Sequence, residues 1–215
     1  VALVAASRGG DEEPALPPGA VAVDVWAPYW TLADGAAVLE ARLDPVREVS
    51  PFWYGARGVS EIVVDENASA EAVAAFLDTA RASGARLVPS ILDQMPAGGM
   101  AAILRNPTTR AQHIDAITAF ADDMDADGID IDYEQFAFAD GTDTWATTQP
   151  AWVAFIEELG AALHADDRTL TVSIPALYDP EATGGDRGYW VYDHGAIAEH
   201  VDRLRIMAYD YSTSE

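Results

Sequence analysis

The chain has 215 residues, of which 36 are acidic and 12 are basic, so its formal charge is −24. Such a chain is not expected to bind nucleic acid or an anionic membrane surface, because both require clustered Lys and Arg. Half of the residues are hydrophobic and none is cysteine, which excludes wholesale disorder, a disulfide framework and a thiol nucleophile.

The N-terminal segment, residues 1–20, is predicted to lie outside the folded domain. Residues 1–7 are small and apolar and resemble the end of a signal peptide, with a short apolar N-terminal stretch as the alternative. Residues 8–19 are rich in Gly, Pro and acidic residues, which is typical of a linker. We therefore expect a secreted or cell-surface protein whose catalytic domain covers residues 21–215. No apolar run reaches the roughly 18 residues of a membrane span.

From residue 21 onward, short apolar runs alternate with helical stretches. Strands are predicted over residues 21–26, 48–54, 86–91, 128–133, 169–174 and 204–209. Helices are predicted near residues 36–42, from a Ser69 cap to Gly84, after Asn106, from Pro150 onward and over residues 193–200. This alternation favours a parallel α/β sheet, either open or closed into a barrel. No G-x-G-x-x-G motif follows the first strand, so a dinucleotide-binding fold loses its main support.

The predicted strand at residues 128–133 is unusually acidic. Side chains alternate along a strand, so Asp130, Asp132 and Glu134 are expected on one face, while Ile129, Ile131 and Tyr133 share the other. Repulsion and desolvation should raise the pKa of at least one of these carboxyl groups, which leaves a protonated acid near neutral pH. Such an acid is what general acid catalysis requires. Glu134 is outermost, at the end of the strand where parallel barrels place their active sites.

This segment resembles the signature of glycoside hydrolase family 18, the chitinase-like family. The D-x-x-D-x-D-x-E signature on the fourth barrel strand is matched by Asp127, Asp130, Asp132 and Glu134. The M-x-Y-D feature on the sixth strand is matched by Met207, Tyr209 and Asp210. The resemblance implies a (β/α)8 TIM barrel, and the six strand–helix units predict that the chain is truncated after the sixth strand.

Two further observations refine the resemblance. Residues 174–211 also resemble the branch of the family related to spore-cortex and peptidoglycan hydrolases. The third strand departs from the family, which often carries S-x-G-G there, whereas Ser90 is followed by Ile-Leu-Asp. The structure of the loop after this strand is therefore left open.

The resemblance also implies a mechanism at N-acetylglucosamine. Glu134 would protonate the leaving oxygen, and the 2-acetamido group of the substrate would attack the anomeric carbon. Asp132 would orient that group, and Asp130 would tune Asp132. Tyr209 would donate a hydrogen bond to the acetamido carbonyl, and Asp210 would bind a sugar hydroxyl or the acetamido nitrogen. No metal or organic cofactor is expected, and the polymer is expected to be chitin or a peptidoglycan-type glycan.

Aromatic side chains near strand ends are candidates for stacking against sugar rings. We predict sugar contacts for Tyr29, Trp53, Phe138 and Trp145, with core packing as the alternative for each. Met207 of the second motif is also predicted to contact substrate. Oligomeric state is left open.

The sequence also allows two alternatives to a glycosidase. Residues 123–134 also match an EF-hand calcium loop, although Asp130 stands where an aliphatic residue is usual and no helix is predicted after Glu134. The second alternative is a carbohydrate-binding relative without catalysis, which the presence of Glu134 disfavours. The four histidines have no metal-ligand spacing and are predicted to be solvated.

Overall fold

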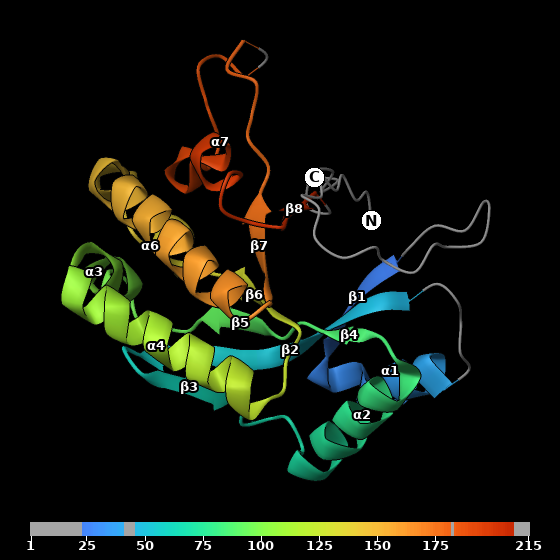
Figure 1. Ribbon diagram of the computed structural model, residues 1–215. Coiled ribbons are helices and arrows are strands. Elements are labelled where there is room, and N and C mark those ends of the chain that lie inside the picture. Colours follow the sequence, from blue (N-terminus) through green and yellow to red (C-terminus); the bar gives the residue numbers. More distant parts are fainter. Residues whose placement is uncertain (1–22, 41–45, 182, 209–215) are drawn as a thin grey trace.

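The computed structural model describes residues 23–40, 46–181 and 183–208. The predicted N-terminal segment, residues 1–20, lies outside them. Six parallel strands form one curled sheet in chain order (Figure 1): β1 (Val23–Pro28), β2 (Val46–Gly58), β5 (Ser90–Asp93), β6 (Gly128–Asp132), β7 (Thr169–Pro175) and β8 (Arg203–Met207). These are six strands of a (β/α)8 barrel, which confirms the predicted fold class.

Two short strands extend β2. β3 (Glu61–Val64) pairs with it in the antiparallel direction, and β4 (Arg86–Leu87) pairs with it in parallel. The predicted third barrel strand, residues 86–91, is therefore divided between β4 and β5. The antiparallel β3 was not predicted from the sequence.

Helices cover the outer side of the sheet. The longer ones are α1 (Leu32–Glu40), α2 (Ala70–Ser83), α3 (Gly99–Arg105), α4 (Pro107–Asp123) and α6 (Trp145–Ala165). The short ones are α5 (Gln135–Phe138), α7 (His194–Ile197) and the 3-10 turns η1 (Tyr29–Thr31), η2 (Thr142–Thr144) and η3 (Trp190–Tyr192). In Figure 1, α4 and α6 lie side by side over the middle strands, while α1 and α2 pack together near β2. None of the described helices is long and apolar enough to cross a membrane.

Local sequence signals explain several helix ends. The Ser69 hydroxyl accepts the Ala72 N–H at the start of α2, and Gly84 ends that helix with φ of 79°, a left-handed conformation that glycine adopts without strain. The Asn106 side chain caps α4, where Pro107 takes the first position. These two helices confirm the predicted boundaries.

The prediction that Pro150 begins the third helix was wrong. Helix α6 begins at Trp145 and contains Pro150 in its interior. An interior proline loses the hydrogen bond of its own N–H and crowds the carbonyl four residues earlier. Packing of the turn before Pro150 offsets this cost, because the Trp145 ring is buried against Trp190 at a centroid distance of 5.5 Å.

The two faces of the sheet have opposite character. The outer face of β6 presents Ile129, Ile131 and Tyr133, which are fully buried in an apolar layer with α4 and α6. The inner face presents Asp130 and Asp132, which are also buried. Burial of charged groups requires compensating partners, so the inside of the curled sheet is where polar chemistry is concentrated.

Candidate active site

The predicted acidic row is present on the inner face of β6. Asp130 is fully buried and Asp132 is 3% exposed. Glu134 follows two residues after the end of β6 and is half-buried. The row therefore runs from the closed interior at Asp130 toward solvent at Glu134. This order places the most accessible carboxyl group at the carboxyl end of the strand, as in other parallel barrels.

Asp130 is held by four hydrogen bonds from four different strands. Oδ2 accepts from Trp26 Nε1 at 3.1 Å, Ser90 Oγ at 2.6 Å and Arg205 Nη1 at 2.9 Å, and Oδ1 accepts from Ser173 Oγ at 2.8 Å. Only an ionised carboxylate accepts hydrogen bonds without donating one. The surrounding strands therefore stabilise Asp130 as an anion.

Asp132 has a different environment. Its Oδ1 atom is buried and has no hydrogen-bond partner among the described residues. Burial raises the pKa of Asp132 well above its ordinary value, and the negative charges of Asp130 and Glu134 raise it further, against a smaller lowering by Arg205. The pKa of Asp132 is thus shifted in the direction that the sequence predicts for one member of the row.

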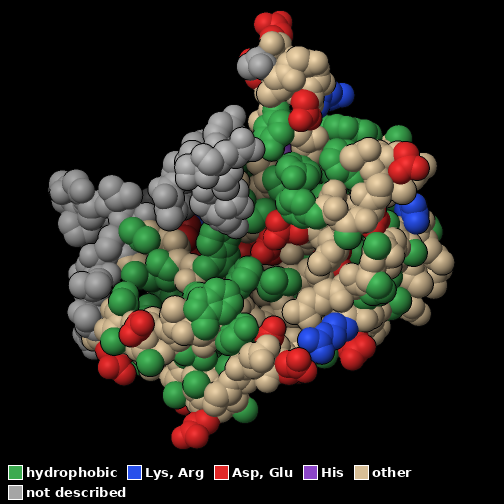
Figure 2. Space-filling model, turned by 180° about the vertical axis from the view of Figure 1, so that it is seen from behind, with side chains coloured by type: hydrophobic (Ala, Val, Ile, Leu, Met, Phe, Trp, Pro, Cys, Tyr) green, Lys and Arg blue, Asp and Glu red, His purple; other side chains and the backbone are tan. Residues whose placement is uncertain are grey.

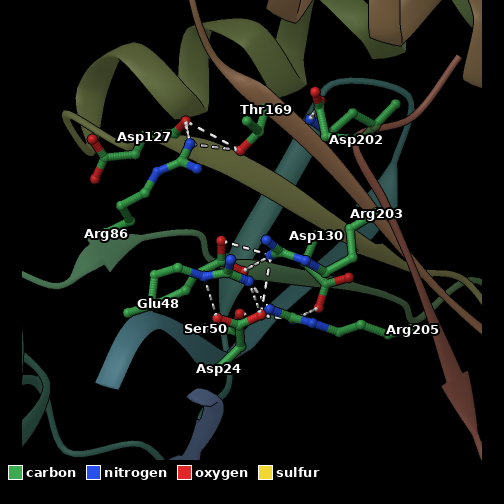
Figure 3. Close-up of polar contacts among 12 residues, drawn as sticks. Asp24, Glu48, Ser50, Arg86, Asp127, Asp130, Thr169, Asp202, Arg203 and Arg205 are labelled. Carbon is green, nitrogen blue, oxygen red and sulfur yellow. Dashed lines mark hydrogen bonds and ion pairs between the residues drawn. The ribbon is translucent and has the colours of Figure 1, made fainter. Parts of the chain in front are cut away.

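An ionic network lies beneath the acidic row. Arg203 and Arg205 point from β8 across the interior to β2 (Figure 3), where both bind the Glu48 carboxylate, Arg203 at 2.8 and 2.9 Å. Arg203 also lies 3.3 Å from Asp24 of β1, which is bound by Arg47 at 2.8 Å. Together with Asp130, the network contains three carboxylates and three guanidinium groups. Such pairing is what permits charges in a closed interior.

Asp127, the first acidic residue of the motif, connects neighbouring strands through hydrogen bonds. Asp127 lies just before β6, and its side chain accepts the Leu87 N–H at 2.7 Å. Its carbonyl oxygen accepts from Arg86 at 3.1 Å and from the Thr169 N–H. Asp127 thus joins the starts of three neighbouring strands and does not belong to the acidic row (Figure 3).

The aromatic residues predicted to contact sugar divide into two with accessible rings and two with buried rings, and Phe138 and Tyr29 are the accessible ones. Phe138 is 51% exposed on α5 and packs against Tyr189 at a centroid distance of 4.7 Å. Tyr29 is half-buried on η1, edge-on to the exposed Trp30 ring. Both lie on segments that follow barrel strands, at the end of the sheet where parallel barrels have their active sites, and their contact with sugar stays a prediction. Figure 2 shows acidic side chains at the bottom of a hollow, with hydrophobic side chains around it.

The prediction for Trp53 was wrong. Trp53 is 2% exposed and packs on the outer side of β2, edge-on to Phe76 of α2 at 5.7 Å. Its ring face is therefore unavailable to a sugar. Trp145 is 5% exposed and packs against Trp190 and Tyr189, so it supports the loops around the site and does not present an open ring face.

The second motif is described only in part. Met207 ends β8 beside Pro175 and is half-buried. Tyr209 and Asp210 lie outside the described residues, and their predicted roles stay predictions. The inner row of β8 is Arg203, Arg205 and Met207, so Met207 is on the same face as the two arginines.

Two other interpretations of the sequence are corrected. Residues 128–132 form a strand whose acids point into the barrel, and the helix after Glu134 has four residues, which is inconsistent with an EF-hand loop. His113 is fully buried and not solvated. Its Nδ1 donates to the Val59 carbonyl at 2.8 Å, so Nε2 accepts from the Tyr133 hydroxyl at 2.7 Å.

Sequence reasoning missed the partners of the acidic row. Arg205 is separated from Asp130 by 75 residues, and Trp26 by 104. A signal was available, because Arg205 lies in the predicted strand over residues 204–209 and Arg203 directly precedes that strand, two residues away and so on the same face if the strand begins one residue earlier. Two buried cations require buried anions, and the acidic strand supplies one of them.

A half-barrel of parallel strands with an acidic row at the carboxyl end of its fourth strand defines an α/β-barrel protein with a carboxylate site. Residues 58–215 match the sequence profile of Glycosyl hydrolases family 18. The chain therefore belongs to glycosyl hydrolase family 18, as the two motifs predicted.

Individual relatives are consistent with this assignment. YdhD of Bacillus subtilis, named provisionally as a sporulation-specific glycosylase, is 30% identical over 111 residues, covering 51% of this chain and 23% of YdhD. A chitinase from Chromobacterium violaceum superposes with a TM-score of 0.68 at 22% identity, covering 89% of this chain and 57% of its own. The spore cortex-lytic enzyme SleL of Bacillus cereus gives 0.64 at 15% identity, covering 89% and 42%. The chain thus spans less than two thirds of each relative, and spore-associated proteins are among them, as predicted.

Proposed function

We propose that the protein is a glycosidase that hydrolyses β-1,4 linkages at N-acetylglucosamine, with Glu134 as general acid and base. The observation that carries this proposal is the graded acidic row, with a fully buried carboxyl group that accepts four hydrogen bonds at its closed end, one of raised pKa in the middle and an accessible one at its outer end. Neighbouring carboxyl groups titrate as a coupled set. We expect the raised pKa of Asp132 to favour retention of a proton within the row, next to Glu134.

The geometry of the row favours participation by the substrate. Most retaining glycosidases place two carboxyl groups about 5 to 5.5 Å apart across the scissile bond, and family 18 is a known exception. Asp132 ends β6 and Glu134 follows two residues later on the same segment, so the two carboxyl groups approach the substrate from the same side. The nucleophile is then supplied by the acetamido carbonyl of the sugar itself.

The proposed reaction has two steps. Glu134 gives its proton to the glycosidic oxygen as the bond from that oxygen to C1 breaks, while the acetamido carbonyl oxygen forms a bond to C1. The positive oxazolinium ion is stabilised by the negative charge of the row, and Asp132 orients the acetamido nitrogen. Glu134, now a carboxylate, takes a proton from water, and the oxygen of that water attacks C1. The bond from C1 to the acetamido oxygen breaks, which opens the oxazolinium ring and restores the acetamido group. Two inversions give net retention.

A cavity of about 510 Å3 supports binding of a polymer. It lies between the loops that follow β6 and β7 and is lined by Thr142, Trp145, Tyr178 and Tyr189, among others. Burial raises the pKa of Tyr189, and the neighbouring Tyr178 and Glu134 raise it further, which places Tyr189 near the proposed acid. Chitin and peptidoglycan-type glycan both present N-acetylglucosamine to such a surface.

Turnover of a chromogenic chitobioside by the full-length protein tests the proposal. Glu134→Gln removes the transferable proton, and we expect a loss of at least 100-fold in kcat with glycan binding retained by calorimetry. Glu157→Gln, the same chemical change on the exposed side of α6, should leave turnover unchanged. A matched glucoside without the acetamido group should not be cleaved.

Two results would contradict the proposal in different ways. Equal rates on the glucoside would exclude the substrate-assisted mechanism. Tight glycan binding by the unmodified protein without turnover of chitin oligomers or cell-wall glycan would favour a carbohydrate-binding protein.

A further inference from the structure

Arg205 is the cation of the acidic site. It is 7% exposed at the middle of β8, with Nη1 at 2.9 Å from Asp130 Oδ2 and 2.8 Å from Ser50 Oγ. Its Nη2 binds Glu48. The guanidinium lies 5.3 Å from the centroid of the Trp26 ring, and the Trp26 N–H also binds Asp130. Arg205 is therefore fixed on several sides and cannot turn away from Asp130 without breaking all of these contacts.

We propose that Arg205 is a positioning residue for catalysis, which holds Asp130 ionised and immobile so that the proton of the acidic row stays on Asp132, next to Glu134. The inference rests on the proposed glycosidase function. Without a cation at Asp130, two adjacent buried carboxyl groups would share one proton between them. The proton would then be displaced toward the closed end of the row, away from the glycosidic oxygen.

Burial, Asp130 and Glu134 raise the pKa of Asp132 more than Arg205 lowers it, so Arg205 acts against a predominantly negative acidic row. The described charged or titratable groups that face it are Asp130, Asp132 and Glu134 of the row, Glu48 of β2, Arg205 of β8 and Tyr192 of η3. Arg205 is the one cation in this set. Glu48 binds Nη2 of the guanidinium whereas Asp130 binds Nη1, so Glu48 anchors the arginine through a separate nitrogen.

Arg203 provides a matched control in the same strand. It stands two residues earlier on the same face and binds Glu48 and Asp24 in the same buried network. Its hydrogen bonds and ion pairs within the described part of the chain reach Glu48 and Asp24 and not Asp130. Removing either arginine therefore disturbs the same network and the same charge balance, but only removal of Arg205 takes a hydrogen bond and a positive charge from Asp130.

The experiment compares Arg205→Gln with Arg203→Gln in the full-length protein, by the pH dependence of kcat/KM on a chitobioside. Loss of the cation makes each proton of the row harder to remove, so the acid limb should move upward by about one to three pH units in Arg205→Gln. We expect kcat to fall at least tenfold, with KM within about threefold. Arg205→Lys should restore the acid limb by restoring the charge, and Arg203→Gln should leave it in place.

A second measurement does not depend on turnover. Infrared difference titration follows the carbonyl band of protonated carboxyl groups, and Asp132→Asn identifies the contribution of the row. This band should persist to higher pH in Arg205→Gln than in the unmodified protein. If Arg205→Gln does not fold, the double variant Glu48→Gln, Arg205→Gln removes one charge of each sign and carries the same prediction.

Identical pH profiles and identical infrared titrations for the two arginine variants would overturn the role of Arg205. An unmodified protein without turnover would overturn the proposed function alone. In that case the infrared comparison still decides whether Arg205 controls the protonation of the row.

Discussion

Asp93 is a second buried carboxyl group close to the site, but on the opposite face of the sheet from the acidic row. It ends β5 with 6% exposure, and its Oδ1 accepts the Met95 N–H at 2.9 Å. Oδ2 is buried without a hydrogen-bond partner among the described residues. Burial raises the pKa of Asp93 to about 6. In family members with S-x-G-G this position would be glycine.

The raised pKa predicts a pH-dependent cost in stability. The folded state binds the Asp93 proton more tightly than the unfolded state, so stability falls as pH rises from about 4 to about 6, and the cost is complete above pH 6. Asp93→Asn keeps an acceptor for the Met95 N–H and removes the charge. The free energy of unfolding of Asp93→Asn, relative to that of the unmodified protein, should therefore increase by about 2 kcal/mol between about pH 4.5 and pH 8.

Urea unfolding at both pH values measures this difference. Asp115→Asn on the exposed side of α4 controls for the substitution itself. A constant difference between Asp93→Asn and the unmodified protein would show that Asp93 has the same proton affinity in both states.

At the level of elements, close packing of α6 against the segment before β8 depends on Gly160. A Cβ at this position would overlap the carbonyl oxygen of His200 and touch Leu170. The glycine therefore lets the helix backbone approach its neighbour directly. This contact positions the segment that leads into β8, and with it Arg203 and Arg205.

Gly160→Ala should destabilise the protein. Overpacking against backbone costs about 1–3 kcal/mol, which outweighs the gain of about 1 kcal/mol in helix propensity. Gly195→Ala in α7 is the control, because a Cβ there meets no atom within 4 Å, so it should be neutral or stabilising. Chemical unfolding of both variants checks the prediction; a stabilised Gly160→Ala would mean that α6 and its neighbour separate easily.

Elements with local signals were predictable from the sequence, and those set by distant contacts were not. Ser69, Gly84 and Asn106 marked helix ends because capping is decided within one turn. Helix α6 was misplaced because burial of Trp145 overrides the usual position of proline. The acidic row followed from strand periodicity, whereas the donors to Asp130 come from four strands that periodicity cannot align with one another.

For the whole molecule, the two edge strands of the curled sheet determine how it can associate with other molecules. Among the described residues, β1 pairs with β2 alone and β8 pairs with β7 alone. Val23 on β1 and Ile206 on β8 are 40% and 36% exposed. Unpaired strand edges with exposed apolar side chains favour association between molecules.

The 215-residue chain alone should therefore self-associate. Size-exclusion chromatography with light scattering should detect dimers or larger species, and the double variant Val23→Lys, Ile206→Lys should reduce them because charge on an edge strand opposes pairing. Val38→Lys replaces an apolar residue of similar exposure on α1 and should not change association. A monodisperse monomer of the unmodified chain would contradict the prediction.

The arginines of β8 bear on the order in which the chain can fold. Arg203 meets Glu48 across 155 residues of sequence, and Arg205 meets Asp130 across 75. As the chain leaves the ribosome, the first five barrel strands would have to gather Asp24, Glu48 and Asp130 with Arg47 as the sole counter-ion of this network. Within this network, the three carboxylates therefore acquire a full set of guanidinium partners only once β8 is in place.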